Sequence, residues 1–262
     1  MATQLVLVQP FKVQVLVGLP LHQSERSFAI QSDILLLGGM SLAYEVVLWD
    51  WNGTLLDDAG FGSSIINNMM RKRGLPEKSR EEHASVFDFP VIGYYERIGF
   101  DFTKEPFEEL SHEFIDAYYR DVKNCELQAG ARKVLDNMKQ AGCRQLILSA
   151  SRQDHLEDQV RYYELSGFFE ELLGIDSVHA PGKTGRGCEW IESSNVSREN
   201  VLLIGDTVHD AQVAGKMGID CWLVGSGHNS ESRLRETGFP FFNSLAEIES
   251  SLMSNSTESA GA

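Results

Sequence analysis

Short apolar runs that alternate with helical segments constrain the fold of this chain more than any other feature of its sequence. The apolar runs predict strands over residues 44–49, 145–148, 174–178, 201–204 and 220–224. Between the later strands, apolar residues at helical spacing predict helices over residues 131–140, 153–165, 183–193 and 211–217. Such alternation is typical of a doubly wound, Rossmann-like α/β core, in which helices cover both faces of a parallel sheet.

Residues 60–124 interrupt this alternation between the first and second predicted strands. Ile65, Ile66, Met69 and Met70 recur at helical spacing, and a second apolar stripe begins at Phe107. We therefore expect an α-helical cap over residues 60–124, inserted into a core that comprises residues 40–59 and 125–252.

The two ends of the chain depart from this pattern. Residues 1–39 contain apolar stretches that prolines interrupt, and Met40 stands just before the first strand. We expect residues 1–39 to be an N-terminal extension, or an upstream start that does not belong to the fold. Residues 253–262 are polar and rich in serine, so a disordered tail is expected there.

The net charge argues against a polyanionic partner. The 262 residues carry a formal net charge of −15, and an acidic surface repels nucleic acids and anionic membranes. No apolar run approaches the ~20 residues that a membrane span needs. The four cysteines are scattered, as is typical of reduced thiols. We expect a cytoplasmic monomer or homodimer that binds neither nucleic acid nor a membrane.

Reactive side chains follow three of the predicted strands. Asp50 ends the first strand, Ser149 the second and Asp206 the fourth, with Asp210 four residues further on. Lys183 precedes the helix between the third and fourth strands. Because ligands bind at the carboxyl ends of the strands in an open parallel sheet, we expect these five side chains to converge.

These residue types suit phosphoryl transfer. The carboxylate of Asp50 can attack phosphorus and form an aspartyl-phosphate, which divides one hard displacement into two easier ones. Mg²⁺ prefers oxygen ligands, and Asp206 and Asp210 can supply them. The phosphoryl oxygens can be held by one cation and neutral donors: Lys183, Ser149 and, beside it, Ala150.

Four segments resemble the motifs of the haloacid dehalogenase (HAD) superfamily. They are Asp50-Trp51-Asn52-Gly53-Thr54-Leu55, Ser149, Lys183 and Gly205-Asp206-Thr207-Val208-His209-Asp210. The resemblance spans roughly residues 42–250, and the helical insertion resembles the cap of the phosphoglycolate phosphatase-like branch.

The resemblance implies roles for individual residues. Asp50 would be the nucleophile and a metal ligand, with the backbone carbonyl of Asn52 and the carboxylate of Asp206 as further ligands. Asp210 would orient or coordinate the metal. In the cap, residues 89–95 resemble the segment that reaches the substrate, which implies substrate contacts from Tyr94 and Tyr95.

Asn52 is a departure from the superfamily pattern. Phosphatases of this kind usually carry an aspartate there, which protonates the leaving oxygen and then activates water. An amide cannot do this, and losing a general acid costs about 10²–10⁴-fold in rate. In addition, Lys183 lacks the proline that usually follows it. Asp57 and Asp58, in the loop after the first motif, are expected to be solvated.

Several interpretations of Asn52 stay open. The favoured one is an Mg²⁺-dependent phosphatase acting on a small phosphorylated metabolite such as 2-phosphoglycolate, in which water or another group carries the proton. Others are a weak relative that binds a phosphorylated ligand, and a phosphotransferase or mutase. An enzyme similar to phosphonoacetaldehyde hydrolases would break a C–P bond and need a cap lysine, here Lys72 or Lys78. Asn52 can also deamidate to aspartate, because Gly53 leaves its own N–H unhindered.

Overall fold

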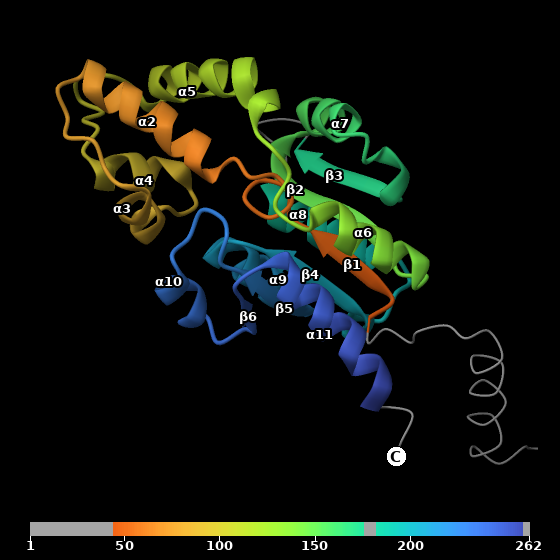
Figure 1. Cartoon of the computed structure of the whole chain (residues 1–262). Helices are drawn as coiled ribbons and strands as arrows, with labels where there is room; N and C mark the ends of the chain where they lie inside the picture. The colour runs from red at the N-terminus through yellow and green to blue at the C-terminus, as the bar shows by residue number, and fades with distance from the viewer. Residues whose placement is uncertain (1–43, 176–181, 259–262) are drawn as a thin grey trace, which may run out of the picture. The chain divides into compact units, whose positions relative to one another are not determined.

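A six-stranded parallel sheet forms the core of the protein (Figure 1). The computed structural model describes residues 44–175 and 182–258, which all belong to one unit, Met40–Ala262. The strands are β1 (Val46–Trp49), β2 (Arg144–Arg152), β3 (Glu171–Ile175), β4 (Val201–Gly205), β5 (Asp220–Val224) and β6 (Phe241–Phe242). Their order, β3-β2-β1-β4-β5-β6, confirms the predicted parallel α/β core. The predicted extension, residues 1–39, lies outside the described residues.

Helices cover both faces of this sheet. Those of the core are α6 (Ala131–Gln140), α7 (Gln153–Tyr162), α8 (Gly182–Ser193), α9 (Val208–Met217), α10 (Glu231–Arg235) and α11 (Leu245–Glu258), with 3-10 turns η1 (Val122–Asn124), η2 (Ser166–Phe168) and η3 (Arg198–Asn200). Val47 and Trp49 of β1 pack in the same cluster as α6, α7 and α11. Val46 and Leu48 pack with α8, α9 and α10. Because successive side chains of a strand point to opposite faces, one four-residue apolar run supplies both halves of the core.

Four helices occupy the segment between β1 and β2, where the sequence predicts a cap. They are α2 (Ala59–Lys72), α3 (Arg80–Val86), α4 (Val91–Ile98) and α5 (Phe107–Asp121). Arg73, at the end of α2, donates to Glu105 Oε2 at 2.6 Å and to Glu113 Oε2 of α5 at 2.7 Å. In Figure 1 the four helices lie beyond the carboxyl end of β1, the end that carries Asp50.

Two predicted strand boundaries are wrong. β2 continues past Ser149 to Arg152, because its pairing with β3 resumes at Arg152 and Ile175 after a register shift. β3 begins at Glu171 and not at residue 174, because its backbone pairs with β2 from that residue onward. β3 is an edge strand, so it accommodates the exposed polar side chain of Glu171, which is not part of an apolar run. Residues 176–178 of that predicted strand lie outside the described residues.

The C-terminal part of the chain is more ordered than predicted. Helix α11 continues to Glu258, so the prediction of a disordered tail is wrong for residues 253–258, and residues 259–262 lie outside the described part. Leu245, Ile248 and Leu252 are buried at helical spacing, which explains how this helix binds the core. Strand β6 and helix α10 are too short to give a periodic signal, and the sequence did not predict them. Across the described residues, every helix is too short or too polar to cross a bilayer.

Candidate active site

The predicted charged residues meet at the carboxyl end of the sheet. Asp50 follows β1, Asp206 follows β4, and Asp210 lies in the first turn of α9. Each of these buried carboxylates offers an oxygen atom, and the three oxygens lie within 4.8 Å of one another. Lys183, in the first turn of α8, donates hydrogen bonds to Oδ1 of Asp50 and to Oδ1 of Asp210. The structure thus brings together four residues that are 160 positions apart at the extremes, counted from Asp50 to Asp210 (210 − 50).

The charges at this point do not balance. Burial opposes a charged lysine, but the neighbouring Asp210 and Asp50 carboxylates outweigh it and raise the pKa of Lys183. Burial raises the pKa of Asp50 well above its ordinary value, and the charges of Asp210 and Asp206 add to this effect, whereas Lys183 opposes it. Lys183 contacts two of the three carboxylates, and the third, Asp206, lies against His228, so the carboxylates outnumber the cations. A hard divalent cation with oxygen ligands suits such a donor set and would relieve the mutual repulsion.

Asp206 is held by groups that leave little freedom to its carboxylate. Its Oδ1 accepts from Thr54 Oγ1 at 2.9 Å, and its Oδ2 accepts from the His228 backbone N–H at 2.6 Å and lies 3.0 Å from His228 Nδ1. Burial acts against a charged imidazole, yet the Asp206 carboxylate raises the pKa of His228 to about 9. Gly53 adopts a φ of +77°, and a Cβ atom there would collide with the Asp206 carboxylate. The glycine thus allows the loop after β1 to lie directly against Asp206.

Asp210 links the site to the start of α9. Its Oδ2 accepts from the Thr207 backbone N–H at 3.0 Å and from Thr207 Oγ1 at 2.6 Å, completing a capping box. The helix begins at Val208, three residues before the predicted start, because this capping box adds a polar first turn. One oxygen of Asp210 therefore binds Lys183, while the other fixes the helix that carries it.

Asn52 is fixed on all sides by side chains that the motifs do not include. Its Oδ1 accepts from Ser151 Oγ at 2.7 Å, and its Nδ2 donates to Asp58 Oδ2 at 2.8 Å and to the Tyr118 hydroxyl at 2.7 Å. Tyr118 also donates to Asp58 Oδ2. Burial first, and the Asp58 charge second, raise the pKa of Tyr118 well above its ordinary value, so the hydroxyl keeps its proton.

Asp58 corrects one expectation. Asp57 is exposed as expected, but the side chain of Asp58 is buried, and its Oδ1 accepts from the Gly53 backbone N–H at 2.7 Å. Sequence reasoning missed Asp58, Tyr118 and His228 as parts of the site. An aspartate pair in a loop looks solvated in sequence, and only the fold brings Tyr118 of α5 against it.

Ser149, the second predicted motif, does not face the central cavity in the way that Asp50 and Lys183 do. The Ser149 side chain is buried, and its Oγ accepts from the Ser151 backbone N–H at 3.0 Å. Ala150 and Ser151 line the central cavity, whereas Ser149 is not among the described residues that do so. β2 continues through this segment with a register shift between Leu148 and Arg152, and Ala150, Ser151 and Arg152 line the cavity.

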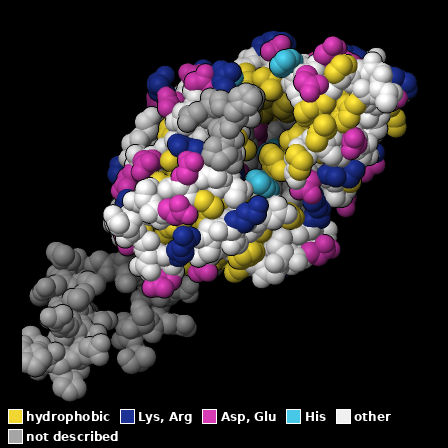
Figure 2. All heavy atoms as spheres, turned by 180° about the vertical axis from the view of Figure 1, so that it is seen from behind, with side chains coloured by type: hydrophobic (Ala, Val, Ile, Leu, Met, Phe, Trp, Pro, Cys, Tyr) yellow, Lys and Arg dark blue, Asp and Glu magenta, His cyan; other side chains and the backbone are white. Residues whose placement is uncertain are grey.

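A cavity of about 820 Å³ separates Asp50 and Lys183 from the cap. Tyr94 and Tyr95 line it, as predicted for residues that meet substrate, although both side chains are almost fully buried. The Tyr94 hydroxyl lies 2.7 Å from Nδ1 of His83 within the cap. Figure 2 shows hydrophobic side chains gathered on the wall of this hollow, with histidine side chains nearby.

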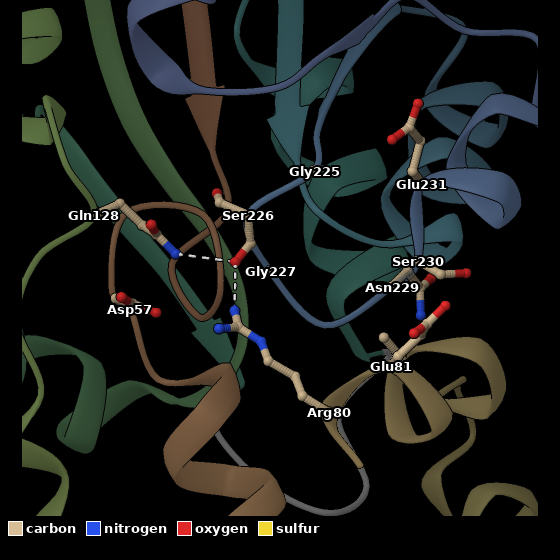
Figure 3. Close-up of a pocket in the computed structure, with 11 residues that line it drawn as sticks. Asp57, Arg80, Glu81, Gln128, Gly225, Ser226, Gly227, Asn229, Ser230 and Glu231 are labelled. Carbon is tan, nitrogen blue, oxygen red and sulfur yellow. Dashed lines mark hydrogen bonds between the residues drawn. The ribbon is translucent and has the colours of Figure 1, made fainter.

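A second cavity, of about 650 Å³, lies between α3 and the loop that follows β5 (Figure 3). Arg80, the first residue of α3, reaches the Ser226 carbonyl with Nη2 at 2.9 Å, and Gln128 approaches the same oxygen at 3.4 Å. The Asn229 side chain donates to the Phe87 carbonyl at 2.8 Å. The loop that holds Asp206 through His228 therefore also holds the cap.

The fold and the site together define an α/β protein with an acidic centre at the ends of its strands and four helices inserted after β1. The family model of haloacid dehalogenase-like hydrolases matches residues 47–224, and the chain belongs to this family. The predicted membership of the HAD superfamily, and the prediction that the chain is a hydrolase, are thereby confirmed.

Relatives of known activity include two kinds of phosphatase. A phosphoglycolate phosphatase from Nitrosospira multiformis is 25% identical over 198 residues, which cover 72% of this chain and 86% of that protein. A 5'-nucleotidase from Pseudomonas aeruginosa is 22% identical over 200 residues, or 74% of this chain and 89% of that protein. A haloacid dehalogenase-like hydrolase from Streptococcus pneumoniae has a similar fold, with a TM-score of 0.68 and 17% identity over 80% of this chain and 98% of its own.

Proposed function

We propose that this protein is an Mg²⁺-dependent phosphatase that hydrolyses a phosphate monoester of a small metabolite through an aspartyl-phosphate on Asp50. The observation that carries the proposal is the contact of Lys183 with both Asp50 and Asp210, beside Asp206. Asp50 and Lys183 line one end of the cavity of about 820 Å³, and we call these four residues the floor of the cavity. This arrangement holds a nucleophile, a cation and metal-ligating oxygens within reach of one phosphoryl group. A cytoplasmic location is part of the same proposal.

Each residue of the floor has a role in this proposal. Asp50, Asp206, Asp210 and the backbone carbonyl of Asn52 would hold Mg²⁺. When bound, the ion would neutralise the carboxylates and polarise the phosphoryl oxygens. Lys183 would hold the phosphoryl group, together with the backbone at Ala150, while Ser149 would support this segment through its contact with the Ser151 backbone N–H. Asp50 would then attack phosphorus, the P–O bond to the alcohol would break, and water would later release phosphate from Asp50.

Two alternatives find less support. A C–P hydrolase would need a lysine facing the substrate, but Lys72 is an exposed residue that pairs with Glu113 at 2.6 Å. Neither Lys72 nor Lys78 is among the described residues that line the central cavity. Deamidation of Asn52 requires the Gly53 nitrogen to attack its side chain, and that N–H donates to Asp58 in the fold.

The relatives supply the first substrates to test. Phosphoglycolate phosphatases and a 5'-nucleotidase both match this chain, so 2-phosphoglycolate and nucleoside monophosphates belong in the first panel. Sugar phosphates with an added sugar acceptor test for a phosphotransferase or mutase, which would transfer the phosphoryl group and release little phosphate.

The test is phosphate release over this panel with Mg²⁺ and with the metal chelated. Wild type is compared with Asp50→Asn and with Asp57→Asn, a control on an exposed carboxylate seven residues away (57 − 50). We expect Mg²⁺-dependent turnover in wild type and Asp57→Asn, and none in Asp50→Asn. Wild type that releases no more phosphate than Asp50→Asn would contradict the proposal. Thermal stabilisation by phosphate esters without turnover would instead identify a binding protein.

A further inference from the structure

The cavity above Asp50 is large compared with a two-carbon leaving group. Its volume of about 820 Å³ lies in the range of ~300–1,000 Å³ that is typical of sites for drug-sized ligands. Asp50, Asn52 and Lys183 line one end of it, and residues from the cap line the other. A phosphoryl group at Asp50 therefore places the rest of a substrate against the cap.

The cap side of this cavity is mainly aromatic and aliphatic, with a few polar residues such as Ser111 and His112. Its lining includes Phe87 and Phe89, from the connection between α3 and α4, and Phe107, Phe114 and Ile115 of α5. Ile115 is 42% exposed, which is unusual for a large apolar side chain in this structure. In Figure 2 many of the hydrophobic side chains of that face gather beside the hollow. An apolar wall of this kind gains free energy when a ligand covers it.

The same wall offers little to a second anionic group. Of the described lining residues, the two arginines are already engaged: Arg152 binds both oxygens of Asp154, at 2.5 and 2.7 Å, and Arg80 donates to the Ser226 carbonyl. A glycolate carboxylate in this cavity would have to compete with Asp154 for Arg152 and with the Ser226 carbonyl for Arg80, or lose its water without a cation in return.

Asn52 supplies a second, independent observation. Its amide is held by Ser151, Asp58 and Tyr118, and it cannot protonate a leaving oxygen. A phenol loses its proton at a pKa of about 10, as the tyrosine side chain does. An aliphatic alcohol is much closer to water, with its pKa of about 15.7. A phenolate therefore leaves phosphorus without help from an acid, whereas an alkoxide does not.

We infer that the natural substrate is an aryl phosphate monoester, whose ring lies against Phe89, Phe114 and Ile115 while its phosphoryl group lies at Asp50. The inference rests on the proposed function and specifies its substrate class. In the reaction, Asp50 displaces a phenolate by breaking the P–O bond, and the phenolate takes its proton from solvent. Water then cleaves the aspartyl-phosphate and yields inorganic phosphate. Flat rings fit an aromatic wall through edge-to-face and offset contacts.

Binding of phosphonates, which do not hydrolyse, tests the ring site separately from turnover. With Mg²⁺ present, calorimetry compares benzylphosphonate with 3-phosphonopropionate, which carries a carboxymethyl group in place of the ring. We expect benzylphosphonate to bind at least about tenfold more tightly, as burial of one phenyl ring predicts. Equal or tighter binding of 3-phosphonopropionate would overturn the inference.

Two isoleucines of equal exposure provide a matched pair of variants. Ile115 lines the cavity and is 42% exposed, whereas Ile92 is 40% exposed and is not among the lining residues. Ile115→Glu should weaken benzylphosphonate binding about tenfold, the effect of exchanging apolar contact for a charge beside an anion. Ile92→Glu should leave it unchanged. Similar effects of both variants would show that the wall near Ile115 does not hold the ring.

Turnover separates the inference from the proposed function. Wild type should hydrolyse phenyl phosphate with a kcat/KM at least about 10²-fold above that for 2-phosphoglycolate, the lower range of what a general acid contributes to an alkyl ester. Higher kcat/KM for 2-phosphoglycolate would overturn the aryl substrate and leave the phosphatase proposal standing. If no ester yields more phosphate than Asp50→Asn allows, the phosphatase proposal fails and the aryl substrate fails with it, whatever the phosphonates show.

Discussion

The floor and the wall of the central cavity are built by different physical rules. At the floor, Asp50, Asp206, Asp210 and Lys183 lie at the ends of strands or the starts of helices, and each is held by hydrogen bonds or ion pairs. The wall consists mainly of apolar side chains from the cap, among which the Tyr94 hydroxyl has a fixed partner in His83. Under the proposed function, charge at the floor selects the reaction, and under the inferred substrate class, shape and apolar area at the wall select the leaving group.

The largest expected effect is at the floor. Lys183→Met should lower kcat/KM for a phosphate ester by about 10²–10³-fold, the usual loss when one group that stabilises transition-state charge is removed. Lys183 is the buried partner of Asp50 and Asp210, so the variant also leaves their charges uncompensated. Steady-state kinetics with Mg²⁺ provide the measurement.

Lys216→Met is the control for this variant, because Lys216 is exposed near the end of α9. Its kinetics and melting temperature should match those of wild type. If Lys183→Met kept wild-type kcat/KM, the floor would not bind the phosphoryl group as we propose. The division of roles between the floor and the wall would then be wrong.

The sequence predicts the floor better than the wall because each floor residue is marked by a pattern in its own segment of the chain. Asp50, Lys183, Asp206 and Asp210 each follow a strand or begin a helix, and parallel strands bring such positions to one edge. The order of the strands and the two-sided core follow from the same alternation. Strand ends were harder to predict, since β2 and β3 continue into polar residues whose backbone pairing leaves no apolar signal.

The parts that sequence did not predict depend on contacts between distant segments. Asp58 is buried because Tyr118, 60 positions along the chain, donates to it. His228 contacts Asp206 from 22 positions away, and it belongs to a glycine-rich loop that resembles any solvated turn. Apolar stripes in the cap predict helices, but they do not reveal which of their residues line a cavity and which pack inside the cap.

Asn52→Asp should have the next largest effect, with the opposite sign. An aspartate can protonate the leaving oxygen, so kcat/KM for an alkyl ester such as 2-phosphoglycolate should rise about tenfold or more toward the 10²-fold contribution of a general acid. The kcat/KM for phenyl phosphate, whose leaving group needs no acid, should gain little. The ratio of kcat/KM for the two esters is the measurement. It tests whether the absence of an acid at position 52 restricts the enzyme to esters with a good leaving group, the kind that the wall binds.

The contact between Asn52 and Asp58 calls for a second variant, in which both residues are changed. Asp58 Oδ2 lies 2.8 Å from Asn52 Nδ2, so Asn52→Asp places two carboxylates side by side and should lower the melting temperature. Asn52→Asp combined with Asp58→Asn restores the number of carboxylates and should recover the stability while keeping the gain in rate. Asn68→Asp, on the exposed face of α2, is the control. If the ratio of kcat/KM for the two esters does not change, position 52 is not the place where the general acid is missing.

The smallest effect on turnover should come from Tyr94→Phe at the wall. The His83 ring bonds at both nitrogens, with Nε2 lying 3.0 Å from Asn67 Oδ1 and Nδ1 lying 2.7 Å from the Tyr94 hydroxyl. Asn67 Oδ1 also accepts from the Lys78 backbone N–H, so it is an acceptor, and His83 Nε2 is therefore the donor to it. Nδ1 of the neutral ring then accepts from Tyr94, and burial lowers the pKa of His83 in agreement with this.

Tyr94→Phe removes that donor and leaves Nδ1 buried and unpaired, which should cost about 1–3 kcal/mol of unfolding free energy and lower the melting temperature by several degrees, at ~2–4 °C per kcal/mol. Because the hydroxyl is engaged inside the cap, kcat/KM should change by less than about threefold, within the range of a lost hydrogen bond remote from the reaction. Tyr162→Phe, on a side chain that is 52% exposed, is the control for stability. A large rise in KM with an unchanged melting temperature would mean that the Tyr94 hydroxyl binds substrate, as the resemblance implied, and that polar as well as apolar contacts select the leaving group at the wall.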